Sequence, residues 1–562
     1  MGLSAAASTG CAVLVERWTL TISQKRWLYV LWLAFIGCFA LLHALHLTAD
    51  FPNHTPWSRD WAKYTDEGWY GNAAIRAHLF GNWYLPGDLN PAPALPVWPF
   101  LEWVLFFFTG VSVEAARGLA VAIFFLNLLL SYLLLRARGP RWMALLALTL
   151  IVTSPFLYCF SRLAILEPTL TALVLAALNL AVRLPGLRRP VAASAAIGLL
   201  FTLAVLSKTT GLFLLPAVGW AMMAPLWRNR RLAARCALVA ASSSCAAFAL
   251  WMAQVIHFGF LADFKYFFSS NQLPRPQEFY WPLVSFWWSF HGGLWVDQTL
   301  IPLAGLVVLG AILASLLPGP ALAQCNRRAR KLLRDPVFGA SVLAVAGSIL
   351  CMAYQNHPQP RYFAVAAFFC FFIVAQGIEA LAGEGDPAGG FWAYRPPGQV
   401  LGWAVAAVAV LAAAFNGLQT LSYALHPEYT FVESAQRLTR YIDEHPNGNR
   451  RLVSSSADQI TLVTHLPALC GEFGTLDLTS KLALYQPGWW ATWNDIDPDT
   501  LRSLHSRYSL EQVASFRAFD DSDRNLLVLF KLHPLPGGRV RDPGAGDLEE
   551  PLPGDKIEIS VQ

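Results

Sequence analysis

The sequence predicts an all-α polytopic membrane protein that carries a small α/β domain after its last membrane span. Of the 562 residues, 55% are hydrophobic and 14% are charged, a balance that few soluble domains have. Eleven apolar stretches approach the roughly 20 residues that a helix needs to cross a bilayer core about 30 Å thick. Polar residues become frequent again only from residue 426 onward, so the α/β domain is expected there.

Each apolar stretch is expected to form one transmembrane helix, about eleven in all. The predicted spans are 27–48, 113–135, 142–159, 166–184, 190–206, 211–227, 236–256, 299–317, 336–354, 362–382 and 399–425. Together they make residues 27–425 a transmembrane domain, which follows a cytoplasmic N-terminus at residues 1–26. Two long external loops interrupt it, at residues 49–112 and 257–298.

The polar C-terminal part is expected to fold into an α/β domain over residues 426–540. Hydrophobic periodicity predicts a helix at 431–444 and strands at 451–454 and 525–532. Residues 541–562 are rich in Pro, Gly and acids, so we expect them to be disordered.

Basic residues assign the two sides of the membrane. Arg17, Lys25 and Arg26 precede the first span, and alternate loops after it are rich in arginine. Because basic loops stay in the cytoplasm, the N-terminus is expected there, and an odd number of spans puts the C-terminal domain on the extracytoplasmic side. The first apolar run lacks a cleavage site and is interpreted as a signal anchor in a bacterial cytoplasmic (inner) membrane. The formal charge of +5 lies largely in these loops, so no nucleic-acid partner is expected.

Cysteine and histidine show no metal-binding pattern. The nine cysteines and twelve histidines are dispersed, without a CxxC pair or an HxxxH motif. No cofactor is therefore predicted from the residues, and a requirement for a divalent metal is left open.

The most informative segment is Asp66-Glu67-Gly68-Trp69-Tyr70 in the first external loop. It puts two adjacent carboxylates just outside the first span, where charge is costly unless it is used. Residues 66–80 are predicted to form a helix along the outer membrane interface, with Trp69 and Tyr70 as amphipathic anchors. The two acids either cap the start of this helix, since carboxylates favour helix N-termini, or belong to a functional site.

Other charged residues recur at the same outer level of the membrane. Arg162, Glu167, Lys208 and Arg361 each fall at the outer end of a predicted span. If the loops converge, the site holds acids beside cations. That combination suits the attack of a hydroxyl on a sugar carbon with departure of a lipid phosphate. A carboxylate accepts the proton of the hydroxyl, and the cations neutralise charge on the phosphate.

On these residues the chain resembles the integral-membrane glycosyltransferases of the GT-C fold, in particular the ArnT-like enzymes and the dolichyl-phosphate-mannose protein mannosyltransferases of glycosyltransferase family 39. The resemblance covers about residues 25–385. It rests on the order and sidedness of four motifs: Asp66-Glu67 with Tyr70, Ser161-Arg162 with Glu167-Pro168, Leu206-Ser207-Lys208, and Arg361-Tyr362. It implies transfer of a sugar from a polyprenyl-phosphate donor to a glycolipid, polysaccharide or protein acceptor.

The resemblance also implies a role for the motif residues. Asp66 is expected to be the general base or to position the acceptor, with Glu67 assisting. Lys208 and Arg361 are expected to bind the donor phosphate. Arg162 and Glu167 are expected to form a buried ion pair or to offer a second contact to the acceptor. The remaining candidates are two phosphate contacts, Tyr362 and His357, and two substrate-binding or structural residues, Tyr70 and His291.

One departure from the ArnT-like pattern follows the acidic helix. Those enzymes often have a Phe-Glu-Lys-Pro segment there, whereas residues 90–99 of this chain contain no lysine. The departure argues against transfer of aminoarabinose to lipid A and shifts the phosphate role towards Arg361 and Lys208.

Two other functions are kept as alternatives to an inverting glycosyltransferase. A polysaccharide polymerase or ligase shares the lipid-linked donors but is expected to lack an acidic pair directly after the first span. A secondary transporter is expected to place polar residues near the bilayer midplane in two related halves.

Overall fold

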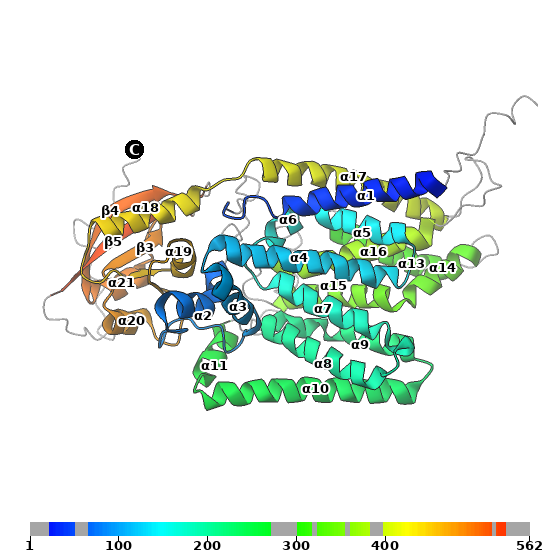
Figure 1. Ribbon diagram of the computed structural model, residues 1–562, viewed down its shortest axis with the longest axis horizontal. Coiled ribbons are helices and arrows are strands. Elements are labelled where there is room, and N and C mark those ends of the chain that lie inside the picture. Colours follow the sequence, from blue (N-terminus) through cyan, green and yellow to red (C-terminus); the bar gives the residue numbers. More distant parts are fainter. Residues whose placement is uncertain are drawn as a thin grey trace, which may run out of the picture.

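The computed structural model describes residues 22–50, 66–270, 300–316, 323–354, 360–382, 397–519 and 524–535. A bundle of long helices forms one part of the molecule, and a small sheet with flanking helices forms the other (Figure 1). The helices α2 (Glu67–Phe80) and α3 (Val97–Thr109) lie where the two parts meet. The predicted class, a helical membrane protein with a C-terminal α/β domain, therefore describes this architecture.

The bundle consists of helices that are apolar on nearly every side, as helices surrounded by lipid and by one another are. They are α1 (Ile22–Leu42), α4 (Val113–Arg136), α5 (Arg141–Thr153), α6 (Pro155–Ser161), α7 (Glu167–Ala181), α8 (Pro190–Ser207), α9 (Leu215–Met223), α10 (Arg230–His257), α13 (Leu300–Leu316), α15 (Pro336–Tyr354), α16 (Ala364–Ala382) and α17 (Pro397–Leu425). Two further helices, α11 (Leu261–Ser270) and the basic α14 (Ala323–Leu333), lie at opposite ends of the bundle (Figure 1).

Short 3₁₀ helices link several of these elements. They are η3 (Leu184–Gly186), η4 (Thr209–Leu214), η5 (Ala224–Leu226) and η9 (Pro360–Phe363). The helix that follows η9, α16, is enclosed by the bundle, because 18 of its 19 residues are buried.

All eleven predicted spans coincide with apolar helices, but their number is not confirmed. Among the described residues, 6 helices are long and apolar enough to cross a membrane, or up to 8 if each bent pair counts as one span. The other three predicted spans, 27–48, 166–184 and 299–317, fall on the shorter apolar helical stretches Arg26–Leu42, Glu167–Ala181 and Ile301–Leu316.

Proline breaks two of these helices, because it has no backbone N–H and cannot continue the ladder. The axes of α5 and α6 differ by 72° at Pro155, and those of α14 and α15 by 61° at Pro336. Side chains cap both breaks: Ser154 Oγ accepts from the Leu157 amide at 3.2 Å, and Asp335 Oδ1 accepts from the Val337 amide at 2.9 Å. The first bend directs the chain towards Arg162.

The C-terminal domain is a mixed sheet of order β2-β1-β3-β5-β4 with helices packed on it. Its elements are α18 (Thr430–Glu444), β1 (Leu452–Ser454), α19 (Ala457–Thr464), β2 (Ala468–Cys470), α20 (Leu478–Tyr485), β3 (Trp489–Trp493), α21 (Pro498–His505), β4 (Tyr508–Arg517) and β5 (Leu526–Pro534). Strand β1 pairs in parallel with β2 and β3, and β5 pairs antiparallel with β3 and β4. The helix predicted at 431–444 and the strands predicted at 451–454 and 525–532 are confirmed as α18, β1 and β5.

Helix α2 is docked on this domain. Trp69 is 6% exposed and belongs to the core that Phe431, Leu438 and Ile460 form. Buried Arg76 donates to Ala468 O at 2.6 Å, which ties α2 to β2. The helix predicted at 66–80 is therefore confirmed, but the prediction that Trp69 anchors it in the membrane interface is wrong, because the indole fills the core of the C-terminal domain.

Candidate active site

Asp66 and Arg361 form an ion pair where the first external loop meets the helix bundle. Arg361 Nη2 lies 2.6 Å from Asp66 Oδ2; the arginine side chain is 6% exposed and the aspartate side chain 35%. The Tyr70 hydroxyl, one turn along α2, lies 3.4 Å from the same carboxylate oxygen. Burial raises the pKa of Tyr70 well above its ordinary value, so the phenol stays protonated and donates. Asp66 is thus held by a buried cation while its carboxylate stays accessible.

A second ion pair lies next to the first. Lys208 Nζ pairs with Glu167 Oε1 and lies 3.8 Å from the centre of the Tyr362 ring, which the Arg361 guanidinium also faces at 5.5 Å. Lys208 follows α8, Glu167 begins α7 and Tyr362 belongs to η9. The two cations therefore share one aromatic ring, and each of them is paired with a carboxylate from another part of the chain.

Two atoms of this cluster have unused hydrogen-bonding capacity. Arg361 Nε and Glu167 Oε2 are buried and have no hydrogen-bond partner among the described residues. Buried polar atoms are almost always paired, so an unpaired donor beside an accessible carboxylate is a feature of a ligand site. The donor on Arg361 can bind an anion while Nη2 keeps Asp66.

Glu67, the neighbour of Asp66, is fully engaged. Arg117 binds it through two hydrogen bonds, from Nε to Oε1 at 2.7 Å and from Nη2 to Oε2 at 2.6 Å. The Ala164 amide at 2.8 Å and Gln459 Nε2 at 3.0 Å also donate to it. Burial pushes the pKa of Glu67 up, but the charge of Arg117 and these bonds outweigh it and lower the pKa. Glu67 is therefore an ionised anchor that joins α2 to α4 and to the C-terminal domain.

The N-terminus of α2 is capped from the C-terminal domain. Asp66 precedes the helix but makes no side-chain capping bond. Instead, Asp458 Oδ2 accepts from the buried Trp69 amide at 2.6 Å. The interpretation of Asp66 as the cap of its own helix is therefore wrong. Because α19 supplies the cap, the Asp66 carboxylate can turn to Arg361.

Gly68 makes this arrangement possible. A Cβ atom at Gly68 would overlap the backbone of Asp458 and come within 2.9 Å of its Cβ. Only a residue without a side chain lets α19 approach α2 so closely. The glycine of Asp66-Glu67-Gly68 thus has a packing role beside the chemical role of its neighbours.

Arg162 lies apart from the two acid–base pairs. Its guanidinium donates to the Tyr158 hydroxyl and to the carbonyl oxygens of Leu45 and His46, just after α1. The predicted ion pair between Arg162 and Glu167 is therefore wrong, because Glu167 pairs with Lys208. Arg162 fixes the chain that leaves the first helix.

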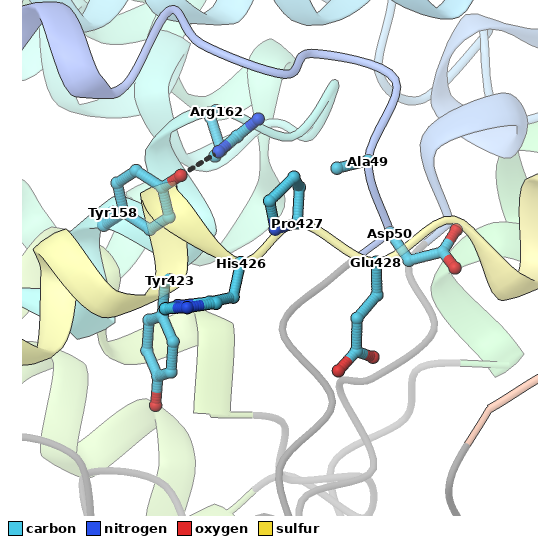
Figure 2. A pocket seen from close by; sticks show the side chains of 8 residues that line it. All are labelled: Ala49, Asp50, Tyr158, Arg162, Tyr423, His426, Pro427 and Glu428. Carbon is cyan, nitrogen blue, oxygen red and sulfur yellow. Dashed lines mark hydrogen bonds between the residues drawn. The ribbon is translucent and has the colours of Figure 1, made fainter.

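Arg162 and Tyr158 line a pocket of about 20 Å³ (Figure 2). Asp50 and Glu428 belong to the same lining. This volume accommodates about one water molecule. Asp50 accepts from the Phe431 amide at 2.8 Å and so holds the start of α18. Burial raises the pKa of Asp50 to about 6, although the Phe431 amide and Arg117 lower it. The pocket lies where the start of the first loop contacts the segment before the C-terminal domain, and it is too small for a sugar.

The two histidines named from the sequence, His357 and His291, lie outside the described residues. The described residues contain no group of three His, Cys, Asp or Glu side chains that could hold a metal ion.

Three residues that shape the site had not been identified from the sequence. Arg117 had a detectable signal, because an arginine inside the predicted span 113–135 demands a partner. Asp458 and Gln459 had none, since acids and amides are ordinary in a polar domain. Their importance comes from where α19 docks.

No family model and no curated protein matches the chain. Among solved structures, ArnT from Cupriavidus metallidurans in the apo state is similar, with a TM-score of 0.56 and 13% identity over 89% of this chain and 98% of that chain. The structure of ArnT from the same organism bound to undecaprenyl phosphate has a TM-score of 0.54 and 14% identity, with the same coverage. The oligosaccharyltransferase AglB from Archaeoglobus fulgidus has a TM-score of 0.48 and 13% identity, over 88% of this chain and 74% of that chain. The chain is therefore a multi-pass membrane protein with the GT-C fold of ArnT.

Proposed function

We propose that this protein is a membrane glycosyltransferase that moves a sugar from a polyprenyl-phosphate-linked donor to an acceptor on the extracytoplasmic side of a bacterial cytoplasmic membrane. The observation that carries the proposal is the Asp66–Arg361 pair, an accessible carboxylate beside a buried cation with an unused donor. The fold supports a lipid-linked donor, because ArnT has been solved with undecaprenyl phosphate bound. The acceptor is a glycolipid, a polysaccharide or a protein.

In the proposed reaction, an acceptor hydroxyl attacks the anomeric carbon from the face opposite the phosphate, so the configuration inverts. The acceptor oxygen bonds to that carbon while the bond from the carbon to the phosphate oxygen breaks, and the electron pair leaves with polyprenyl phosphate. Asp66 takes the proton of the hydroxyl and returns it to solvent through its exposed side. Glu67 assists by fixing the start of α2, and so the direction of Asp66.

The departing phosphate gathers negative charge, which the two cations neutralise. Arg361 is proposed to bind it through Nε while Nη2 keeps Asp66 aligned, so one guanidinium connects the base to the leaving group. Lys208, which lies 3.8 Å from the centre of the Tyr362 ring, contributes a second positive charge. Because the side chains of Lys208 and Arg361 are buried, their charges act strongly on the transition state. A phosphate contact by His357 remains a prediction.

The arrangement of charges favours an enzyme over a secondary transporter. The four charged groups gather at one end of the bundle rather than near the midplane of the helices. A polysaccharide polymerase or ligase would use the same donor chemistry, and its product distinguishes it.

Transfer of labelled sugar from polyprenyl-phosphate donors, measured in membranes that contain the full chain, tests the proposal. Asp66→Asn is expected to lower transfer by about 10²- to 10⁴-fold, the usual contribution of a general base. The control is Asp443→Asn, which removes a carboxylate from the exposed pair with Arg450. Unchanged transfer in a folded Asp66→Asn protein would refute the proposed base. Product length separates single transfer from polymerisation, and a chelator arm tests the need for a metal.

A further inference from the structure

A large cavity with a mixed polar and apolar lining lies at the end of the bundle opposite to Asp66. It has a volume of about 690 Å³ and lies between the α4–α5 connection, the start of α5, α14 with the link that follows it, the end of α16, and α17. Its polar lining consists of Arg138, Arg328, Lys331, Asp335, Gln376 and Glu379. None of these residues takes part in the proposed transfer, and the volume falls in the ordinary range for small-ligand sites.

The cations of the cavity are only partly neutralised. Arg138 Nε pairs with Asp335 Oδ2 at 2.8 Å, and Asp335 Oδ1 also accepts the Val337 amide. Arg328 and Lys331, one turn apart on α14, form no ion pair with another described residue. Three cations therefore face two carboxylates, and the two on α14 are available to a phosphate.

Gln376 indicates that the ligand must also offer a hydrogen-bond donor. It is 3% exposed, and its Nε2 donates to Asp335 Oδ1 at 3.3 Å. Its Oε1 has no hydrogen-bond partner among the described residues. A buried carbonyl oxygen that lines a cavity calls for a donor, so the ligand needs a hydroxyl group as well as an anionic group.

The surroundings indicate that the ligand comes from the bilayer. The apolar part of the lining includes Trp142 and the 52% exposed Trp403, and indole rings are typical of the membrane–water interface. Helix α14 buries Cys325 and Ala329 against the bundle, whereas Lys331 is exposed and Arg328 is half-buried at the cavity. Basic pockets between transmembrane helices bind the headgroups of anionic lipids.

We propose that this cavity binds the headgroup of an anionic phospholipid, with its phosphodiester on Arg328 and Lys331 and a glycerol hydroxyl on Gln376 Oε1. By the distribution of basic loops this end faces the cytoplasm. The site therefore takes its lipid from the leaflet opposite to that of the proposed sugar donor. The proposal of this lipid site does not depend on the proposed glycosyl transfer.

Binding is tested with the purified full chain in neutral detergent, titrated with phosphatidylglycerol while thermal stability is followed. Arg328→Gln with Lys331→Gln is expected to weaken the saturable stabilisation at least tenfold. The matched control is Arg327→Gln with Arg334→Gln, which removes the same charge from the same region but spares the cavity lining. The control is expected to change the apparent affinity less than twofold. Equal losses in both double variants would indicate diffuse attraction and overturn the proposal.

A second variant tests the hydroxyl contact without touching the cations. The native protein is expected to bind phosphatidylglycerol more tightly than phosphatidic acid, which lacks the glycerol headgroup, and Gln376→Met is expected to abolish this preference. An unchanged preference overturns the assignment of Gln376. Soluble glycerophosphoglycerol is expected to bind far more weakly than the lipid, and equal affinity would assign the cavity to a soluble phosphodiester instead.

Discussion

Asp458 accepts the backbone amide of Trp69 at 2.6 Å, across 389 residues of sequence. A helix N-terminus is usually capped by the residue directly before it. Here that residue is Asp66, and its carboxylate lies on Arg361 instead. The cap supplied by the C-terminal domain therefore decides which way the proposed base points.

We expect Asp458→Ala to impair transfer more than folding. Loss of a cap costs about 1–2 kcal/mol, whereas a slight displacement of a catalytic group lowers turnover roughly tenfold or more. Thermal stability and transfer kinetics are measured together. Asp458→Asn, which keeps an acceptor oxygen, should recover much of the turnover.

The matched control is Asp477→Ala, which removes the cap of α20, where Asp477 Oδ1 accepts the Ser480 amide at 2.7 Å. This variant should lose similar stability and keep transfer. If both alanine variants lower transfer to the same extent, Asp458 has no special role in positioning the site.

Gly68→Ala is expected to separate α19 from α2. The added methyl group overlaps the Asp458 backbone, and overpacking of this kind costs about 1–3 kcal/mol. Faster proteolysis of the C-terminal domain and reduced transfer should appear together. Gly219→Ala in α9, where a Cβ meets nothing within 4 Å, serves as the control and should be silent. Native proteolysis and native transfer in Gly68→Ala would contradict the close packing.

The pair between Lys208 and Glu167 allows structural and chemical roles to be separated. Lys208→Met leaves a buried carboxylate unpaired, which costs about 3–5 kcal/mol. Adding Glu167→Gln should restore most of the stability, but transfer should stay low because the positive charge near the phosphate is still missing. Recovery of transfer in the double variant would make Lys208 a purely structural residue. Thermal melts and initial rates of both variants give the answer.

Asp50 should make stability depend on pH below neutrality. Burial raises its pKa to about 6, from an ordinary value of 3.8 in the unfolded chain. Between these values the folded protein holds a proton that the unfolded chain does not. The stability contributed by Asp50 is thus present below about pH 4 and lost as pH rises through about 6, by about 3 kcal/mol at most.

Asp50→Asn, which stays neutral, should flatten this dependence. The difference in melting temperature between pH 4 and pH 6.5 is measured for both proteins in the same detergent. Identical slopes for the two proteins would show that Asp50 does not change its proton affinity on folding.

Sidedness predicted most of the charged residues that meet, but it also included Arg162, which lies apart from them. Asp66, Lys208 and Arg361 were chosen because each lies at an outer membrane end, where an unpaired charge is costly. Sidedness could not predict the pairing. Glu167 lies five residues from Arg162 in sequence, yet the bend at Pro155 and the exit of α1 take Arg162 to backbone carbonyls and leave Glu167 to Lys208.

The part played by the C-terminal domain could not be predicted from the sequence. Trp69 looked like an interfacial anchor because aromatic residues are common at membrane surfaces, and only the docked sheet turns it into a core residue. Gln459 reaches Glu67 across 392 positions, and no local pattern marks such a contact.

The cap that Asp458 provides for α2 also sets an order of events during synthesis. Helix α19 is translated after α17, so all the predicted membrane helices have been synthesised before the residue that caps α2 exists. A partly made chain in the membrane already carries Asp66, Lys208 and Arg361, but the helix that aims Asp66 is still uncapped. Membrane insertion of the helices and alignment of the proposed base are thus separate steps. A chain that stops before residue 457 carries the membrane helices but lacks α19, which caps α2 and aligns Asp66.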